Sequence, residues 1–526
     1  MSICKEGPTW LKLLKLLKKK QWALAAVSVF FVVTQVWLEL TMPDYMADIT
    51  RLVQTDGSTM QEILTAGGKM LACALGSLIA SILTAICATR IAATFSAALR
   101  EKLFRKVMSF SMEEIGHFST ASLITRSTND VTQIQMLIAI GLQLLVKAPI
   151  MAVWAICKIA NKQWEWTFST GVAVIVLLAV VGLCLLLVTP KFKKIQTLTD
   201  DLNRVTRENL TGLRVVRAYN AERYQETKFE HANQALTSTN LFAQRTLSFM
   251  MPSIQLVMSG LSLAIYWIGA VLINNARIGG KLNLFTDMMV FSQYAIQVVM
   301  SFMMLVMIFM LLPRASVSAK RIQAVLDTDP SIIDGTETDS NCNASGTIEF
   351  KNVSFHYPDE EECVLKNITF TAKKGETVAL IGSTGCGKST VINLIPRFYD
   401  ASEGQVLVDG IDVRKYPQKE LRNKIGYVSQ KATLFTGTIR SNVAYGDNGH
   451  PSASQEDVKN AIATAQATDF VENLGDQYDA YVAQGGSNFS GGQKQRISIA
   501  RAIARHPEIL IFDDSFSAPV SYTHLR

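Results

Sequence analysis

The sequence predicts a membrane α-helical six-span domain followed by an α/β P-loop nucleotide-binding domain. Hydrophobic residues make up 49% of the chain and charged residues only 18%, which is too apolar for an ordinary soluble protein. Six apolar stretches each approach the ~20 residues that a helix needs to cross a bilayer. After them, residues 382–390 read GSTGCGKST, which fits the phosphate-binding pattern G-x-x-x-x-G-K-[ST].

The six stretches lie near residues 22–40, 63–87, 136–159, 166–188, 249–273 and 284–312. Basic residues precede the first stretch and follow the second and fourth, whereas the segment between the first two is mainly acidic. Because basic residues concentrate on the cytoplasmic side, we predict a multi-pass protein of the cytoplasmic (plasma) membrane with both termini in the cytoplasm. The connections 89–135 and 190–248 are then long cytoplasmic loops of helical character.

Residues 10–22 read WLKLLKLLKKKQW, a basic amphipathic pattern typical of a helix on a membrane surface. We therefore assign residues 1–21 to an interfacial amphipathic helix and residues 22–320 to the six-span domain. A cleaved signal peptide is the alternative, but no convincing cleavage site follows.

Lys147 lies well inside the third span, where a charge is costly. It is a candidate to line a cavity. Snorkelling toward the interface and pairing with a hidden acidic residue explain it equally well.

The hydrophobic period changes to two after a polar linker, residues 321–346. Residues 347–357, 364–370, 405–408 and 425–428 alternate like strands, and residues 378–381 form an apolar β-type run before the phosphate loop. A helical pattern returns at 454–474, where Ser454 and Asp457 are spaced as a capping box. Residues 347–526 are therefore predicted to form the nucleotide-binding domain.

The phosphate loop brings together glycines, a lysine and hydroxyls, each with a distinct role. The glycines let successive backbone N–H groups turn toward an anion, and the following helix N-terminus adds positive charge. Lys388 can reach the β- and γ-phosphates, and the Ser389 hydroxyl can bind Mg²⁺. The candidate nucleotide-binding residues of the loop are Gly382, Ser383, Thr384, Gly385, Cys386, Gly387, Lys388, Ser389 and Thr390.

Residues 509–512 are an apolar run that ends in Asp513 and Asp514. A buried strand would hold its terminal carboxylate beside the Mg²⁺ that Ser389 also contacts, so Asp513 is a candidate metal ligand. An ordinary buried strand that ends in a solvated acid is the alternative.

Residues 488–496 read NFSGGQKQR, which resembles the signature sequence of ABC transporters. Tyr357 is placed like that family's adenine-stacking aromatic residue, and Gln430 in YVSQ like its Q-loop glutamine. Six spans ahead of such a domain resemble an exporter-type half-transporter, with residues 118–131 and 208–219 as its two intracellular loops. The resemblance implies that ATP and Mg²⁺ bind between one chain's loop and another chain's signature, here Ser490, Gly491, Gly492 and Gln493. It also implies that Gln430 contacts the metal and takes part in catalysis.

Two features depart from the family pattern. Asp514 stands where the family has a catalytic glutamate, and its side chain is one methylene shorter. Because a displacement of ~1 Å can cost on the order of 10²-fold in rate, this resembles the weak-site subunit of a heterodimer. The chain also ends at Arg526, before the family's later motifs, so we expect a nucleotide-binding domain that is incomplete at its C-terminus.

The resemblance implies an ATP hydrolase that drives export of amphipathic small molecules, either drug-like compounds or lipids. Its expected partners are the lipid bilayer, the amphipathic substrate and a second half-transporter, with a heterodimer favoured over a homodimer. Nucleic acid is not an expected partner, although the net charge is +7. The alternative is a regulatory or structural subunit that binds ATP without hydrolysing it.

Overall fold

The protein divides into two compact units, which we describe separately. In a computed structural model, the described residues are 17–55, 58–160, 162–277, 280–337, 346–358, 360, 362–447 and 451–515. The membrane unit comprises residues 1–103 and 125–324, and the ATP-binding unit comprises residues 104–124 and 325–526.

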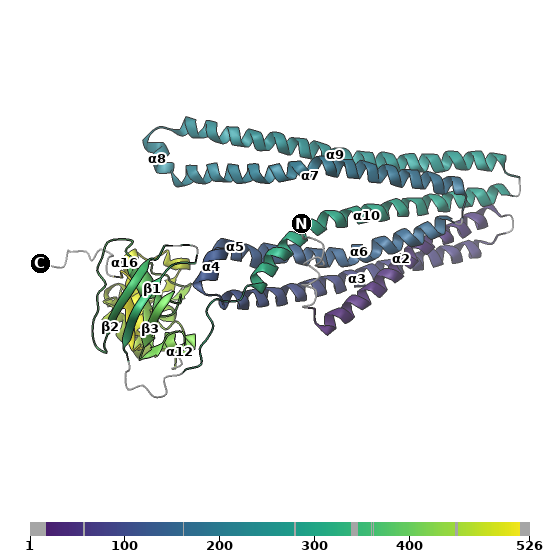
Figure 1. Cartoon of the computed structure of the whole chain (residues 1–526). Helices are drawn as coiled ribbons and strands as arrows, with labels where there is room; N and C mark the ends of the chain where they lie inside the picture. The colour runs from purple at the N-terminus through teal and green to yellow at the C-terminus, as the bar shows by residue number, and fades with distance from the viewer. Residues whose placement is uncertain are drawn as a thin grey trace. The chain divides into compact units, whose positions relative to one another are not determined.

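Six helices in the described residues are long and apolar enough to cross a membrane, which confirms the six-span prediction (Figure 1). Residues 1–16 of the predicted interfacial helix lie outside the described residues, and Lys19 is the first residue of the first span helix. The helices are α2 (Lys19–Gln54), α3 (Met60–Met108), α6 (Val131–Ala160), α7 (Trp164–Thr211), α9 (Glu222–Asn275) and α10 (Lys281–Asp327).

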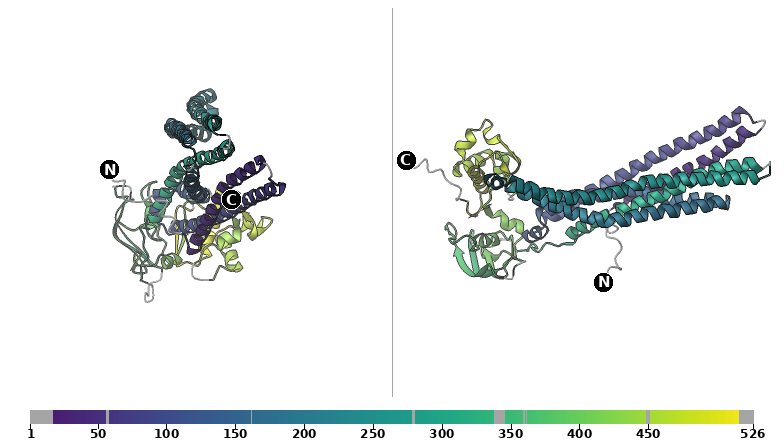
Figure 2. Two further views of the ribbon diagram at one scale, coloured as in Figure 1. Left: turned by 90° about the vertical axis from the view of Figure 1, so that its right-hand side faces the viewer. Right: turned by 90° about the horizontal axis from the view of Figure 1, so that it is seen from above.

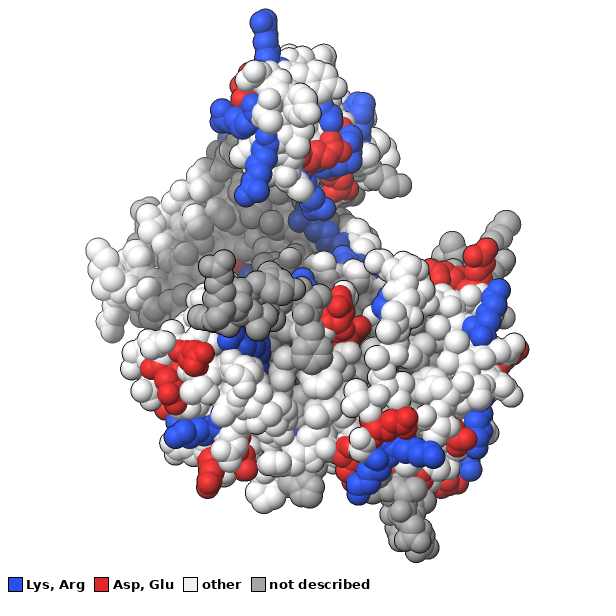
Figure 3. Space-filling model, turned by 90° about the vertical axis from the view of Figure 1, so that its left-hand side faces the viewer, with Lys and Arg blue, Asp and Glu red and all other residues white. Residues whose placement is uncertain are grey.

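Helices α7 and α9 continue well beyond the length that a bilayer requires. The 48 residues of α7 extend about 70 Å at the rise of an α-helix, against a hydrocarbon core of about 30 Å. The two helices run side by side and are joined through the short helix α8 (Leu213–Ala218), as Figures 1 and 2 show. Charges of both signs gather at this turn (Figure 3), including Glu208 between Arg204 and Lys228. Such polarity fits a segment outside the hydrocarbon.

An apolar core joins α2, α6, α7, α9 and α10 within the membrane unit. Trp166 packs against Phe291 with ring centroids 5.4 Å apart. At Gly269 a Cβ atom would overlap the Met288 side chain, so glycine at this position lets α9 lie close to Met288 of α10. Contacts of this kind supply much of the association energy between helices in lipid.

Lys147 has an acidic partner. Its Nζ lies 2.9 Å from Oε1 of Glu39 on α2, which is the second of the two explanations left open by the sequence.

The ATP-binding unit contains an antiparallel sheet and a parallel strand pair, which confirms the α/β prediction. The antiparallel sheet has the order β2-β1-β3-β4, and β5 pairs in parallel with β8. The strands are β1 (Ile348–Phe355), β2 (Leu365–Ala372), β3 (Glu403–Val408), β4 (Ile411–Asp412), β5 (Ile425–Val428), β6 (Gly437–Thr438), β7 (Tyr481–Val482) and β8 (Ile509–Phe512).

Two apolar cores hold these strands and the helices that surround them. One lies between the antiparallel sheet, the β5–β8 pair and α11, and the other surrounds α13, α14 and α16. The predicted capping box is confirmed, since Ser454 accepts from the Asp457 backbone at the start of α14. The helices are α11 (Lys388–Leu394), α12 (Gln418–Asn423), α13 (Ile439–Val443), α14 (Gln455–Thr464), α15 (Thr468–Glu472) and α16 (Gly491–Ile503).

The prediction of a strand at residues 378–381 is wrong. These residues are not assigned to any strand, and the Ile381 side chain is 95% exposed. An apolar β-type run becomes a strand only when a neighbour accepts its backbone hydrogen bonds, and no described segment pairs with this one.

Residues 104–124 group with the ATP-binding unit and contain α4 (Met112–Phe118) and most of α5 (Thr120–Thr125). The predicted first intracellular loop, residues 118–131, is thus divided between the two units after residue 124. The Glu114 carboxylate accepts hydrogen bonds from the Ser111 backbone and hydroxyl at the start of α4. It also accepts one from the Ser331 backbone N–H, 2.8 Å away in the linker. Burial opposes ionisation, but these hydrogen bonds hold the pKa of Glu114 below its ordinary value. Helix α4 and the linker are therefore joined by one buried carboxylate.

We expect Glu114→Gln to destabilise the ATP-binding unit by about 1–3 kcal/mol at neutral pH, because it weakens bonds to a charged acceptor. A group whose folded pKa is depressed contributes stability above its unfolded pKa and loses that contribution as pH falls through the folded pKa. The difference between wild type and variant should therefore shrink at acidic pH. Denaturant unfolding of the full chain in detergent at several pH values measures this difference in the free energy of unfolding.

The matched control is Glu113→Gln, an exposed neighbour on the same helix. Equal effects of the two variants would contradict the assignment.

Candidate nucleotide-binding site

The phosphate loop leads directly into α11 through two glycines with left-handed backbones. Gly385 has φ +86° and Gly387 has φ +90°, a region that favours glycine. At Gly387 a Cβ atom would also lie 2.8 Å from a Leu365 methyl group. Both the turn and the packing on β2 therefore require glycine at the start of α11.

Lys388 folds back over the loop. Its Nζ donates to the carbonyl oxygens of Gly382 and Ser383, each at 2.8 Å. An ammonium held at this place would form stronger, charge-assisted bonds with a phosphate. Lys388 therefore lies over the loop, and its contact with the β- and γ-phosphates stays a prediction.

The two predicted metal ligands meet at the carboxyl end of β8. The Ser389 hydroxyl donates to Oδ1 of Asp513 at 2.8 Å, and Asp513 is only 8% exposed. Hard oxygen donors of this type suit Mg²⁺. The residues present therefore fit the metal that the family implies.

Gln430 and Asp514 also lie together. Strands β5 and β8 are parallel neighbours, so the residues that follow them emerge at the same edge. Gln430 Nε2 lies 3.3 Å from Oδ2 of Asp514. Asp514 has φ +45°, a conformation that aspartate tolerates better than most residues. The structure thus brings the predicted catalytic pair to the edge where Asp513 lies.

Tyr357 is tied to the last residue of the loop. Its hydroxyl lies 3.1 Å from Oγ1 of Thr390, and its ring meets those of Phe355 and Tyr399 edge to face. Tyr399 was missed in the sequence analysis, because an aromatic residue after α11 belongs to no motif we used. The only signal was the aromatic pair Phe398-Tyr399.

The signature residues form the N-terminal cap of α16. Ser490 Oγ accepts from the Gln493 backbone N–H at 3.3 Å, and Gln493 Oε1 accepts from the Ser490 N–H at 2.9 Å. Gly491 and Gly492 form the first turn, whose free N–H groups can bind an anion. Among the described hydrogen bonds, none joins residues 490–493 to residues 382–390.

Cys386 lies exposed within the loop, 3.7 Å from Nζ of Lys388. Because the Cys386 thiol is exposed, we expect maleimide to label it faster than Cys184, which is partly buried on α7. Mg-ATP should slow this labelling by covering the loop. Peptide mapping after brief treatment, with and without Mg-ATP, measures both effects. Equal rates for the two cysteines, or no protection, would argue against the loop geometry.

Two family models together cover most of the chain. Residues 25–302 match the ABC transporter transmembrane region, and residues 365–517 match the ABC transporter domain. The chain belongs to the ABC transporter family. Its membrane and ATP-binding domains are fused in one chain, as in exporter half-transporters, so it is a multi-pass membrane protein of the exporter type.

Curated relatives include ABC transporters of bacteria. An uncharacterized ABC transporter ATP-binding protein of Mycobacterium bovis is 38% identical over 453 residues, covering 86% of this chain and 75% of the relative. One of Bacillus subtilis is 35% identical, covering 94% and 84%. The ATP-dependent lipid A-core flippase of Pseudomonas fluorescens is 32% identical, covering 80% and 68%.

The fold of this ABC transporter also matches a solved structure. A bacterial Atm1-family ABC exporter with ATP bound superposes with a TM-score of 0.74 and 25% identity. The match covers 96% of this chain and 86% of the other. Together with the relatives, it supports ATP-driven export as the general activity.

Proposed function

We propose that this ABC transporter exports amphipathic small molecules, either lipids or drug-like compounds, across the cytoplasmic membrane. The observation that carries the proposal is the convergence of Ser389, Asp513, Gln430 and Asp514 beside the phosphate loop, in a chain that also carries six spans. The flippase relative supports an amphipathic substrate.

In the proposed mechanism, the backbone N–H groups of residues 382–390 and Lys388 bind the phosphates of ATP. Ser389 and Asp513 would hold Mg²⁺, with Gln430 nearby, and the bound metal supplies positive charge that offsets the phosphate charge. Gln430 and Asp514 orient the attacking water, and Asp514 accepts its proton. Tyr357 stacks on the adenine.

We propose a dimer of half-transporters, in which Ser490, Gly491, Gly492 and Gln493 act on the partner's ATP. A heterodimer is favoured because Asp514 is one methylene shorter than the family's glutamate, which would slow hydrolysis at this chain's own site. The lysine- and arginine-rich connections support a cytoplasmic location for both termini.

The second candidate is a regulatory subunit that binds ATP without hydrolysing it, and Asp514 is the observation that favours it. Vanadate-sensitive ATPase activity, measured with this chain and a partner half-transporter in proteoliposomes, separates the two. Stimulation of that activity by amphipathic compounds supports export. ATP binding without any stimulated hydrolysis would support the regulatory role instead.

A further inference from the structure

Three oppositely charged pairs lie along α6 within the membrane unit. Their N–O distances are short, between 2.6 and 2.9 Å. The lysines are on α6 or directly after it, and the carboxylates are on α2 and α10. The pairs are Lys147–Glu39, Lys158–Asp44 and Lys162–Asp287.

The Lys147–Glu39 pair is the least exposed of the three, with side chains 18% and 21% exposed. Gln35 and Ser77 also donate to Glu39, at 2.8 and 3.4 Å. All these bonds reach Oε1, so among the described contacts Oε2 of Glu39 has no partner. Ionisable groups at such depth are costly and are usually kept for a function.

The second pair lies further along the same face of α6. Lys147 and Lys158 are eleven residues apart, just over three full helical turns, so they point in nearly the same direction. Asp44 also accepts from the Tyr294 hydroxyl at 2.7 Å. Lys158 is 39% exposed, about twice as much as Lys147. The two pairs beyond Lys147 are both more exposed than the Lys147–Glu39 pair.

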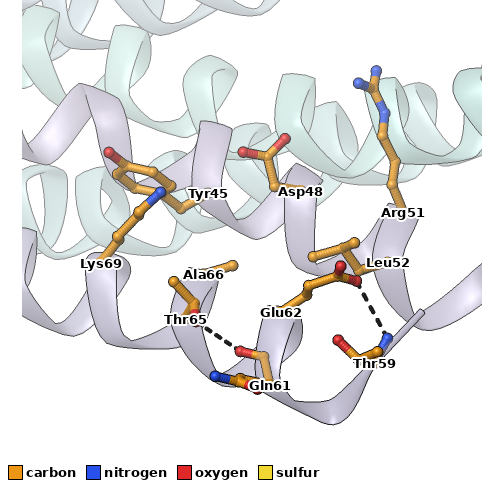
Figure 4. Close-up of a pocket in the computed structure, with 10 residues that line it drawn as sticks. All are labelled: Tyr45, Asp48, Arg51, Leu52, Thr59, Gln61, Glu62, Thr65, Ala66 and Lys69. Atoms are coloured by element: carbon orange, nitrogen blue, oxygen red, sulfur yellow. Dashed lines mark hydrogen bonds between the residues drawn. The ribbon is translucent and has the colours of Figure 1, made fainter.

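A cavity of about 700 Å³ lies one helical turn beyond Asp44, between the adjoining ends of α2 and α3 (Figure 4). Asp48 and Glu62 supply negative charge to its lining, and Arg51 and Lys69 supply positive charge. Within the described ranges, these four side chains form no ion pair with one another. Charges of both signs thus remain available to a ligand here.

Charge balance decides which ligand these pairs can accept. An anion that displaced Glu39 from Lys147 would leave a carboxylate unpaired in a poorly solvated site, and a cation would leave the lysine unpaired. A molecule that carries both charges can replace the two partners at once without leaving either uncompensated. We propose that the α2–α6 ion pairs, together with the cavity of Figure 4 at the end of α2, bind the headgroup of a zwitterionic amphiphile that carries a phosphate and an ammonium group.

This inference rests on the proposed export function and names its substrate class. The simpler explanation is that the ion pairs only clamp the helices together. If the ion pairs only hold the helices together, each lysine stays paired with its carboxylate, and the protein binds all lipid headgroups equally.

The experiment measures equilibrium binding to the full chain in a nonionic detergent, without ATP. The probes are dihexanoyl phosphatidylethanolamine, the phosphatidylglycerol with the same acyl chains, and a cationic dihexanoyl trimethylammonium analogue. We expect the zwitterionic probe to bind at least about tenfold more tightly than either of the others. Equal binding of the three probes would overturn the inference.

Variants then distinguish headgroup binding by the ion pairs from a purely structural role in holding the helices together. Glu39→Gln with Lys147→Gln keeps the site neutral but should abolish the preference for the zwitterion. The swap Glu39→Lys with Lys147→Glu keeps both charges and should retain the preference. The control pair, Asp201→Asn with Arg204→Gln on the exposed part of α7, should change nothing. An unchanged preference in the neutral double variant supports a clamp and overturns the inference.

A second variant keeps the test valid if changes inside the membrane unit prevent folding. Arg51→Gln with Lys69→Gln alters only exposed side chains of the cavity and should weaken binding of the zwitterion about tenfold. Unchanged binding would count against the proposal. Because binding is measured without ATP, a failure of transport leaves this result standing. Conversely, if all amphiphiles stimulate the ATPase activity equally, the result supports export. The same result overturns the inference that a zwitterionic headgroup is preferred.

Discussion

Lys388→Ala is expected to weaken ATP binding at this chain's own site by about 10- to 100-fold. The ammonium now donates to two loop carbonyls and is the loop's only side-chain cation, so alanine removes the charge-assisted bonds to the phosphates. Hydrogen bonds to charged groups contribute about 1.5–3 kcal/mol, which corresponds to this range of affinity. Photolabelling of this chain with a reactive ATP analogue, titrated against unlabelled ATP, measures the change.

The control for this experiment is Lys374→Ala, which removes an exposed lysine of the same unit outside the phosphate loop. It should leave labelling unchanged. If Lys388→Ala labels as strongly as wild type at every ATP concentration, the assignment of Lys388 to the phosphates is wrong.

Ser490→Ala is expected to abolish most ATP turnover by the assembled dimer, by on the order of 10²-fold, whereas Asp514→Ala should leave most of it. The asymmetry follows from the proposed heterodimer, in which this chain lends its signature to the partner's efficient site. Its own site, with the shortened carboxylate, contributes little. Steady-state ATPase activity of the dimer measures both effects.

Ser490→Ala also removes the N-cap of α16, which alone could cost about 1 kcal/mol of stability. The matched control is Ser454→Ala, because it removes an equivalent capping box from α14. It should leave turnover unchanged. Full, cooperative ATPase activity from a purified homodimer would refute the heterodimer.

The sequence predicted the parts of the site that depend on local chemistry. Glycines with left-handed backbones, a lysine and hydroxyls within nine residues dictate the phosphate loop, and an apolar run before two acids dictates β8. Ser490 and Gln493 were named from the resemblance of residues 488–496 to the ABC signature, and the structure shows that they cap α16. In each case the relevant residues are close in sequence.

Contacts between distant segments could not be predicted in this way. Glu39 lies 108 residues before Lys147, and no local pattern links the two. The strand prediction for residues 378–381 was wrong for the opposite reason. Their local pattern favours a strand, but strand formation depends on a neighbouring segment. The ring contact between Tyr357 and Tyr399 could not be predicted either, because the two residues are far apart in sequence and no local pattern links them.

The tie between Glu114 and Ser331 sets an order for biosynthesis. The two residues are 217 positions apart, and the last four span helices are made between them. At about 5–20 residues per second, helix α4 waits about ten to forty seconds for the linker that completes its contacts. The ATP-binding unit can therefore finish folding only after the final span has been synthesised. A chain whose synthesis stops before residue 331 therefore carries α4 without this contact.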